Sequence, residues 1–428
     1  MGCRTRRLLV VTIAAAAVLL IGGDALATGA GSPDPTFGTG GFTVTPFGSP
    51  DFPMLAHAAA AAVDANGGSV VLGVSAPSSV GAPTYELAVL RYLPTGTLDP
   101  DFGTGGVTSI ALDASATAGG IAIDSQGRIV ADGFSTGKGA VLRLLPDGSR
   151  DPSFGVNGVT QFAAPGHTSL EVRSLVLGAN DRPVVVGDAV DPGDGDGDAM
   201  LARFGSDGTL DATFGSGGFA FLSRDARSFA LFVAARGGGA KIAAAGWITK
   251  DGGSPRAAVF RFGRDGSPDG TFSQDGSATY RLERNTTVEP TGIAVRRSDG
   301  EVYVASWDTG QTWTVGLAAF SGNGLPDAGF GGGDGRRAYD PTGFGDVPMD
   351  LARASDGDLV VSGGVAEGAS LLMRVTSIGE PDASFGTGGV ALNASPGGSL
   401  AAVTFDLKGR IVGVGSTGSS ILIGRFRS

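Results

Sequence analysis

The sequence contains one cysteine, Cys3, and two histidines, His57 and His167, among its 428 residues. Because a disulfide needs two cysteines, core burial has to hold the folded chain together. Two imidazoles are too few for a histidine metal cluster, and a Ser-His-Asp triad would have to use one of them. Composition therefore favours a protein without catalysis, although it does not exclude an enzyme.

Basic residues are also scarce, with 31 Lys and Arg against 42 Asp and Glu and a net charge of −11. This acidity argues against nucleic acid and anionic membrane surfaces as partners. After the first 27 residues the sequence shows neither helical periodicity nor an apolar stretch long enough to span a membrane. An all-β chain is expected.

The first 27 residues resemble an export signal. Arg4, Arg6 and Arg7 precede an apolar run, Leu8 to Ile21, and Ala25-Leu26-Ala27 offers a small-x-small cleavage site. We expect residues 1–27 to be a signal peptide and residues 28–428 to be one secreted domain without a membrane span. An uncleaved membrane anchor is the alternative interpretation.

One segment recurs seven times and dominates the rest of the sequence. It begins as Asp-x-x-Phe and usually continues Gly-x-x-Gly, and it is called here the Asp-Phe-Gly segment. Its aspartates are Asp34, Asp99, Asp151, Asp211, Asp269, Asp327 and Asp382, spaced by 65, 52, 60, 58, 58 and 55 residues. Such spacing is typical of propeller blades.

Four strand-length runs lie in each repeat. Two runs flank a polar Gly turn, as in residues 121–133 and 403–415, and a third run precedes the Asp-Phe-Gly segment. A short fourth run follows it. Apolar runs separated by Gly and Asp turns indicate antiparallel strands, and radial repetition of four strands indicates a propeller. The prediction is a seven-bladed β-propeller of four-stranded antiparallel blades.

The segment itself has a structural interpretation. We expect its Asp to cap a one-turn helix, its Phe to fill the space between blades, and its glycines to adopt positive φ. An Arg lies eight residues before the Asp in most repeats and should contact that Asp or carbonyls beside it. These arginines are Arg91, Arg143, Arg203, Arg261 and Arg374, with Arg425 in the last repeat and Ala319 breaking the series.

The Asp-x-x-Phe-Gly-x-x-Gly pattern, with the preceding D-x-x-G-R-I-V turn, resembles the bacterial delta-60 repeat family. That family is similar to NHL-type propellers. The resemblance covers residues 33–428 and implies an extracellular propeller, without implying a common chemistry. Ser273 and the widened Gly331–Gly335 copy depart from the pattern.

The termini predict how the ring closes. The repeat region starts with an Asp-Phe-Gly segment and a fourth-strand run, Phe42–Phe47, whereas the sequence finishes on a third-strand run. The N-terminal strand should therefore complete the last blade, and one chain should form the closed ring as a monomer.

Function is expected on one face of the ring. Comparison of the repeats shows that the second-to-third and fourth-to-first loops vary most, and these loops share one face. Trp247, Trp307 and Trp313 lie beside these loops, with Arg284 and Glu289 nearby in sequence. Aromatic and charged groups together suit a sugar ring or a peptide, although packing is the alternative role of these tryptophans.

Calcium is the one cofactor that the sequence suggests. Asp191, Asp194, Asp196 and Asp198 alternate mostly with glycine in a second-to-third loop. Closely spaced carboxylates on a flexible backbone suit a hard cation, but a solvated acidic loop explains the pattern equally well.

Two functional classes remain. The preferred one is a secreted, non-catalytic binding or scaffold module for a glycan or a protein. The alternative is a lactonase-like propeller hydrolase or lyase acting at the channel mouth. The first-strand runs are mostly Ala, Ile, Val and Leu, which favours the binding module.

Overall fold

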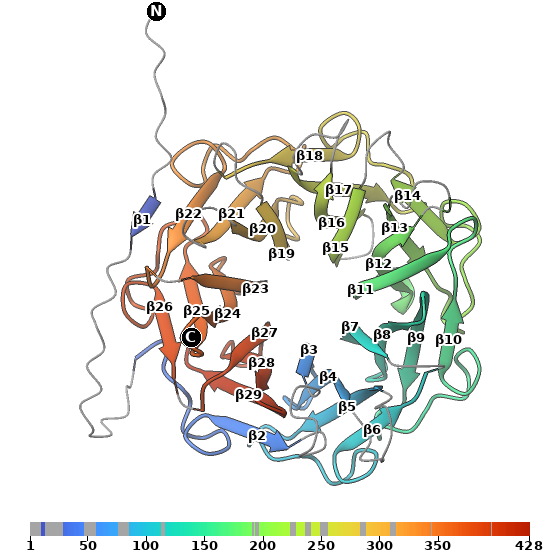
Figure 1. The fold of residues 1–428 in the computed structure, drawn as a ribbon, viewed down its shortest axis with the longest axis horizontal. Coiled ribbons are helices and arrows are strands. Elements are labelled where there is room, and N and C mark those ends of the chain that lie inside the picture. Colours follow the sequence, from blue (N-terminus) through green and yellow to red (C-terminus); the bar gives the residue numbers. More distant parts are fainter. Residues whose placement is uncertain are drawn as a thin grey trace, which may run out of the picture.

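The computed structural model shows seven four-stranded antiparallel sheets arranged as blades around a central axis (Figure 1). It describes residues 10–12, 29–46, 57–75, 85–112, 116–190, 192, 197–222, 228–235, 241–248, 256–282, 288–308, 314–343, 345–394 and 396–428. The predicted seven-bladed β-propeller is confirmed.

In blades one to six the strands follow chain order from the centre of the ring outwards (Figure 1). Blade one contains β3 (His57–Val63), β4 (Ser69–Ser75), β5 (Glu86–Tyr92) and β6 (Val107–Ile110). Blade two contains β7 (Thr117–Ile123), β8 (Ile129–Ser135), β9 (Lys138–Leu144) and β10 (Val159–Phe162). Blade three contains β11 (Ser169–Leu177), the short 3-10 helix η1 (Ala179–Asp181), β12 (Pro183–Val190), β13 (Gly197–Arg203) and β14 (Phe219–Leu222).

The second half of the ring repeats this plan. Blade four contains β15 (Ser228–Ala235), β16 (Lys241–Ile248), β17 (Arg256–Gly263) and β18 (Ser277–Tyr280). Blade five contains β19 (Val288–Val295), β20 (Val302–Asp308), β21 (Thr314–Phe320) and β22 (Arg336–Asp340), with β1 (Val10–Thr12) parallel to its outer edge. Blade six contains β23 (Asp346–Arg353), β24 (Leu359–Val365), β25 (Ser370–Val375) and β26 (Val390–Asn393).

Blade seven closes the ring with both ends of the propeller region. It contains β27 (Ser399–Phe405), β28 (Ile411–Thr417), β29 (Ser420–Phe426) and β2 (Phe42–Pro46). β2 pairs with β29, with Thr43 opposite Ile423. The predicted closure by the N-terminal strand is confirmed, because the outer strand of this blade comes from the start of the propeller.

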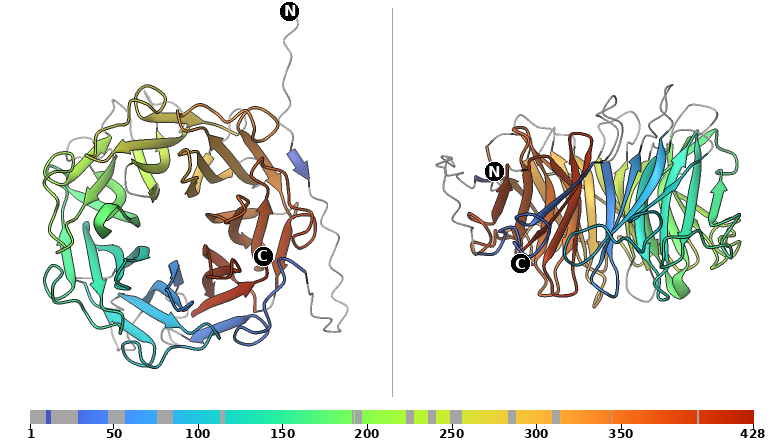
Figure 2. Two further views of the ribbon diagram at one scale, coloured as in Figure 1. Left: turned by 180° about the vertical axis from the view of Figure 1, so that it is seen from behind. Right: turned by 90° about the horizontal axis from the view of Figure 1, so that it is seen from below.

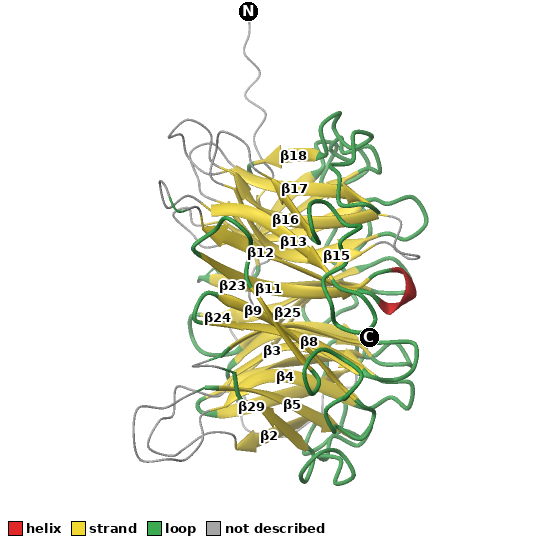
Figure 3. Ribbon diagram, turned by 90° about the vertical axis from the view of Figure 1, so that its right-hand side faces the viewer, coloured by secondary structure: helices red, strands yellow, loops and turns green. Residues whose placement is uncertain are grey.

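Two faces of the disc differ in their connections (Figure 2). First-to-second turns and third-to-fourth connections share one face, called the turn face. Second-to-third and fourth-to-first loops share the other, called the loop face. η1 and the C-terminus lie on the turn face, among the long connections drawn in green (Figure 3). Antiparallel pairing in every blade makes this division unavoidable.

Core burial occurs between blades, as the repeat predicts. Seven apolar clusters each join residues of two adjacent blades. The segment phenylalanines lie at these junctions with at most 1% of their surface exposed: Phe37, Phe102, Phe154, Phe214, Phe272, Phe330 and Phe385. Each therefore fills an inter-blade space, which confirms the expected role of the Phe.

A backbone hydrogen bond accompanies each Phe. The residue after it donates its N–H to a carbonyl of the next blade's turn, at N–O distances of 2.6–3.1 Å. The donors are Gly38, Gly103, Gly155, Gly215, Ser273, Gly331 and Gly386. The acceptor of Gly386 is Ala30, so the N-terminal segment receives the bond that completes the ring.

Arginine reinforces the same junction. Arg143 Nε donates to Asp151 Oδ2 at 2.7 Å, and another of its nitrogens donates to the Ser206 carbonyl of blade three at 2.5 Å. Its guanidinium also lies 4.7 Å from the centroid of Phe154. All six arginines pair with their segment aspartates at 2.6–3.2 Å, which confirms the expected contact.

The expected one-turn helix does not form. Asp151 instead closes a β-turn, because its carbonyl accepts from Phe154 N while its Oδ1 accepts from Ser153 N. Gly155 follows immediately at a φ of 53°. That conformation ends any right-handed turn after the Phe, so the Asp caps a turn of four residues.

Blade five replaces the missing arginine with other contacts. Asp327 N still donates to the carbonyl of Ala319 at 2.9 Å, so the backbone turn persists. Arg337 pairs with Glu380 of blade six, and Tyr339 Oη donates to Gly379 O at 2.7 Å. Two outer-strand side chains thus join blades five and six.

Replacing Arg143 with alanine tests the inter-blade contact. The change leaves the buried Asp151 carboxylate without its closest partner, so we expect a loss of about 3 kcal/mol in unfolding free energy. Denaturant unfolding measures this loss. Arg256→Ala, at an exposed site with no ion pair to a described residue, should change stability by less than about 0.5 kcal/mol; equal losses would contradict the assignment.

Removing residues 33–47 tests the closure. The truncated chain loses β2 and Asp34, which leaves an unpaired edge on β29 and an unpaired Arg425. We expect aggregation and a lower melting temperature in size-exclusion and calorimetric measurements, because open strand edges pair with other chains. A truncated protein as stable and monodisperse as residues 28–428 would contradict the closure.

Candidate functional site

The sequence places its candidate ligand residues on the loop face, and the structure describes part of that set. Trp247, Trp307, Glu289 and Asp198 have described positions. Trp313, Arg284, Asp191, Asp194 and Asp196 lie outside the described residues. The geometry of the tryptophan site therefore depends on the first three, and only one residue of the calcium loop is placed.

Trp247 and Trp307 occupy the same position in adjacent blades. Each is the penultimate residue of its second strand, β16 or β20, near the loop face. Trp247 pairs with Phe229 and Trp307 with Glu289, in each case one residue before a bulge in the first strand. Both tryptophans are partly exposed. The expectation that they share a rim of the ring agrees with this register.

The two indoles serve different inter-blade junctions. Side chains alternate along a strand, so Trp247 lies on the same blade side as Ala243 and Ala245, which pack between blades four and five. Trp307 likewise lies on the side of Tyr303 and Ala305, between blades five and six. Each tryptophan therefore covers the loop end of its own junction.

Blade three carries charged side chains at the positions equivalent to Glu289 and Trp307, and they were not predicted from the sequence. Glu171 is opposite Asp188, as Glu289 is opposite Trp307. Arg173 is the bulged residue beside them, and it pairs with Glu171 and lies 3.6 Å from Asp188 Oδ1. The available signal was the sequence of β11, which carries charge where the other first-strand runs are mostly apolar.

Glu171, Arg173 and Glu289 lie on the first strand of their blade, and Asp188, Trp247 and Trp307 lie on the second strand beside it. β11 and β19 are the innermost strands of their blades (Figure 1), and the side chains of Glu171 and Arg173 are each 41% exposed. We call the following six residues the inner rim of blades three to five: Glu171, Arg173, Asp188, Trp247, Glu289 and Trp307. The rim thus combines carboxylates, one guanidinium and indoles in equivalent register.

Asp188 is electrostatically distinct within the inner rim. Burial raises its pKa to about 6, while Arg173 opposes the rise and Glu171 adds to it. Near pH 6 this carboxyl therefore exchanges its proton. A proton-exchanging acid beside a second carboxyl group is the minimum equipment for general acid–base chemistry.

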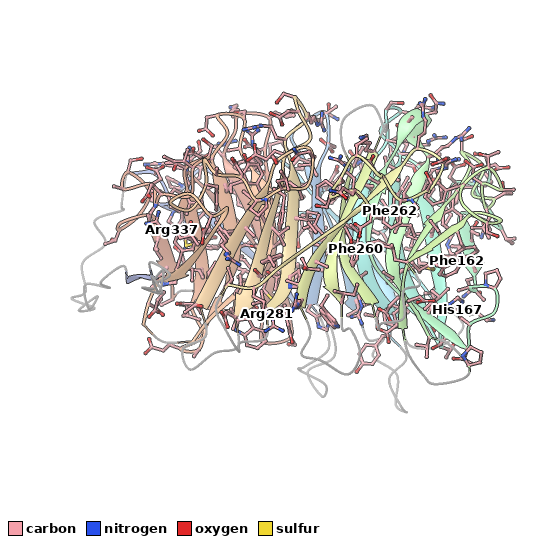
Figure 4. All side chains as sticks on the ribbon, turned by 90° about the horizontal axis from the view of Figure 1, so that it is seen from above. Phe162, His167, Phe260, Phe262, Arg281 and Arg337 are labelled. Atoms are coloured by element: carbon pink, nitrogen blue, oxygen red, sulfur yellow. The ribbon has the colours of Figure 1, made fainter. Side chains whose placement is uncertain are left out.

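His167 and Asp198 meet on the outer part of the same face. His167 Nε2 lies 3.5 Å from Asp198 Oδ2, and its ring stacks on Phe221 with centroids 4.6 Å apart. Figure 4 shows His167 and Arg281 towards the same face of the disc. The other histidine, His57, is exposed at the start of β3. Asp198 is therefore engaged by a histidine in addition to its place in the acidic loop.

A serine motif occurs in blade two that sequence reasoning overlooked. Residues 133–137 read Gly-Phe-Ser-Thr-Gly, the G-x-S-x-G pattern. The structure places it across the hairpin of β8 and β9, with Thr136 at a φ of 50°. A nucleophile elbow joins a strand to a helix, so this motif forms a hairpin turn instead.

The described part of the chain contains neither a cluster of metal-ligating side chains nor a membrane-spanning helix. Within the described ranges, no three His, Cys, Asp or Glu side chains gather as a metal site would require. No helix in those ranges has the length and hydropathy that a membrane crossing requires.

Comparison with known proteins identifies a repeat family for three segments. Residues 125–154, 181–214 and 241–272 match the family described as a domain of unknown function (DUF5122) beta-propeller. The segments begin at or just after the first-to-second turn and end at the segment Phe, in blades two, three and four. These matches support a β-propeller repeat family. The sequence matches none of the curated proteins.

Two solved structures are similar to this chain at low identity. Raptor from Chaetomium thermophilum is similar with a TM-score of 0.54 and 10% identity, over 86% of this chain and 28% of that one. YCF48 bound to D1 peptide has a TM-score of 0.49 and 12% identity, over 92% and 97% of the two chains. At such identity the Raptor likeness shows the fold alone.

A buried carboxyl in blade two permits a test of pH dependence. Asp132 is fully buried, accepts a hydrogen bond from Gly120 N, and has a pKa raised to about 7 by burial. Because the folded protein holds this proton more tightly than the unfolded chain does, Asp132 contributes its full stability at a pH below the unfolded-state pKa. That stability is lost as the pH rises through 7. Asp132→Asn removes this titration.

The unfolding free energy of Asp132→Asn, relative to that of the unchanged protein, should be higher at pH 8 than at pH 4 by on the order of 4 kcal/mol. Denaturant unfolding at the two pH values measures the difference. Asp147→Asn should show no such gain, since hydrogen bonds from Ser149 lower the pKa of Asp147. A pH-independent effect of Asp132→Asn would contradict the assignment.

Proposed function

We propose that this chain is a secreted, non-catalytic binding propeller whose inner rim of blades three to five binds a glycan. The observation that carries the proposal is the shared register of Glu289 with Trp307 and of Glu171 with Asp188, with Trp247 between them. Indoles stack on sugar rings, while carboxylates accept hydrogen bonds from sugar hydroxyls. A protein ligand is the other occupant that such a rim suits.

Secretion follows from residues 1–27 and is part of the same proposal. Removal of that segment gives a mature chain more acidic by two charges, because it carries three Arg and one Asp. We also propose that the seven Asp-Phe-Gly segments are copies of the delta-60 repeat. The three matched propeller segments support a repeat of this kind. Calcium binding by the Asp191–Asp198 loop completes the proposal.

Substitutions in the inner rim test the binding function. A glycan array probed with residues 28–428 identifies the ligand, and Trp307→Ala and Glu289→Gln should each weaken its binding about tenfold or more. Phe134→Ala is the matched control, because Phe134 holds the Trp307 position in blade two, opposite Thr117. The control should keep full affinity.

Two results would overturn this site. In the first, both rim variants bind with full affinity and the melting temperature of Trp307→Ala falls by several degrees. That result would make Trp307 a packing residue. The other is an equal loss of binding in Phe134→Ala, which would mean that the ligand does not select blades four and five.

A propeller hydrolase or lyase is the second candidate, and the titration of Asp188 favours it. A carboxyl with a pKa of about 6 beside Glu171 can donate a proton while its neighbour stays ionised. Hydrolysis of a lactone or glycoside by the mature chain, abolished in Asp188→Asn with binding retained, would establish this function instead of the binding module.

A further inference from the structure

A cavity of about 620 Å³ lies between blades three and four on the turn face, opposite the inner rim. Arg182, Arg203 and Arg264 all line it, together with Asn180 and Asp265. Three guanidinium groups in one cavity are unexpected in a chain whose net charge is −11. The volume is within the range of small-molecule sites.

The first source of this charge is an irregular turn in blade three. Blades two and seven have a short Asp-x-x-Gly turn, closed by Gly127 N to Asp124 O and by Gly409 N to Asp406 O. In blade three the turn contains η1, with positive φ at Asn180 and Asp181. Asp181 Oδ2 accepts from Ser125 Oγ of blade two at 2.5 Å. The turn is thus held by a contact on its blade-two side.

The second source is a single substitution in blade four. Arg264 follows the third strand at a position that holds uncharged residues in other blades, namely Pro94, Pro146, Ser206, Gly322 and Ser377. Its side chain is exposed and forms no ion pair with any described residue. Two departures from the repeat therefore meet at the same cavity.

The carboxylates near this cavity are too few to balance its three guanidinium groups. Arg182 and Arg203 share one acceptor, Asp211 Oδ2, at 2.8 Å each. The Oδ1 atom of Asp265 is engaged within its own turn by Ser267. Each nitrogen of Arg203 already donates within the protein, to Asp211, to the Arg264 carbonyl and to Thr213 Oγ1. Arg203 therefore adds positive charge, whereas the Arg182 side chain is 41% exposed and keeps donors for a ligand.

We propose that this cavity binds a tetrahedral oxyanion, the phosphate or sulfate group of a small molecule. Guanidinium forks bind such oxyanions through paired hydrogen bonds. Here the exposed forks of Arg182 and Arg264 come from separate segments, the η1 turn and the turn after β17, and both line the cavity. A planar carboxylate needs only one fork, whereas a tetrahedral group offers oxygens to both.

A second cavity provides an internal control. Between blades one and two a cavity of about 490 Å³ occupies the turn face, lined by Arg150, Asp101 and Asp147. One cation and two acids give it the opposite charge balance, so it should not bind an oxyanion. The comparison separates the effect of charge from that of an inter-blade cavity as such.

Titration calorimetry of residues 28–428 with inorganic phosphate, sulfate and acetate tests the proposal. Phosphate or sulfate should bind, and Arg264→Ser, which installs the residue of the equivalent blade-three position, should weaken binding at least tenfold. Its melting temperature should be unchanged, because Arg264 is exposed. Arg150→Ser, in the control cavity, should bind as the unchanged protein does.

Four outcomes decide the matter. Preference for phosphate over sulfate, or the reverse, supports the site and names the group. Acetate binding as tightly as phosphate would replace the tetrahedral site with a carboxylate site. No heat at millimolar phosphate and sulfate, or equal affinity of Arg264→Ser, would overturn the proposal. None of these results bears on glycan binding at the inner rim, so the two proposals fail separately.

Discussion

The fold depends on one interaction repeated around the ring, the hydrogen bond from the residue after each segment Phe to the next blade's turn. No blade can satisfy this N–H within its own sheet, because the chain leaves the sheet at that point. The acceptor is always a neighbour, and the buried Phe keeps water away from the bond. In addition, six arginines form charge-assisted hydrogen bonds with the segment aspartates at these junctions.

This interaction explains why function is expected on the loop face. All seven bonds of this kind lie on the turn face, so substitutions in its connections disturb the junctions. The loop face has inter-blade bonds at single junctions, such as Leu170 N to Gly137 O and Gly398 N to Gly368 O, instead of one bond repeated in every blade. There the blades differ: Asp188, Trp247 and Trp307 share one register position across three blades. The turn face also varies at the arginine cavity. The junction beside that cavity is nevertheless intact, because Gly215 N still donates to Asp265 O.

The sequence predicts the repeated part of this structure well, because each residue type appears seven times, or nearly so, at a fixed offset. Phe102 and Arg91 are assigned by their repetition, and the pairing of β2 with β29 follows from the order of the runs. The one-turn helix was a wrong expectation, since the positive φ of Gly155 is a property of the folded turn. Glu171 and Arg173 were missed because their meeting with Asp188 depends on strand register and a bulge, which no repeat reveals.

The most direct test of the central interaction is native-state hydrogen exchange at the seven donor amides, Gly38, Gly103, Gly155, Gly215, Ser273, Gly331 and Gly386. If these bonds hold the ring together, all seven exchange only by global unfolding, with equal opening free energies that include Gly386 at the closure. Exchange of several of them by local opening, while the inner strands stay protected, would show that these bonds do not hold the blades together and would contradict the account.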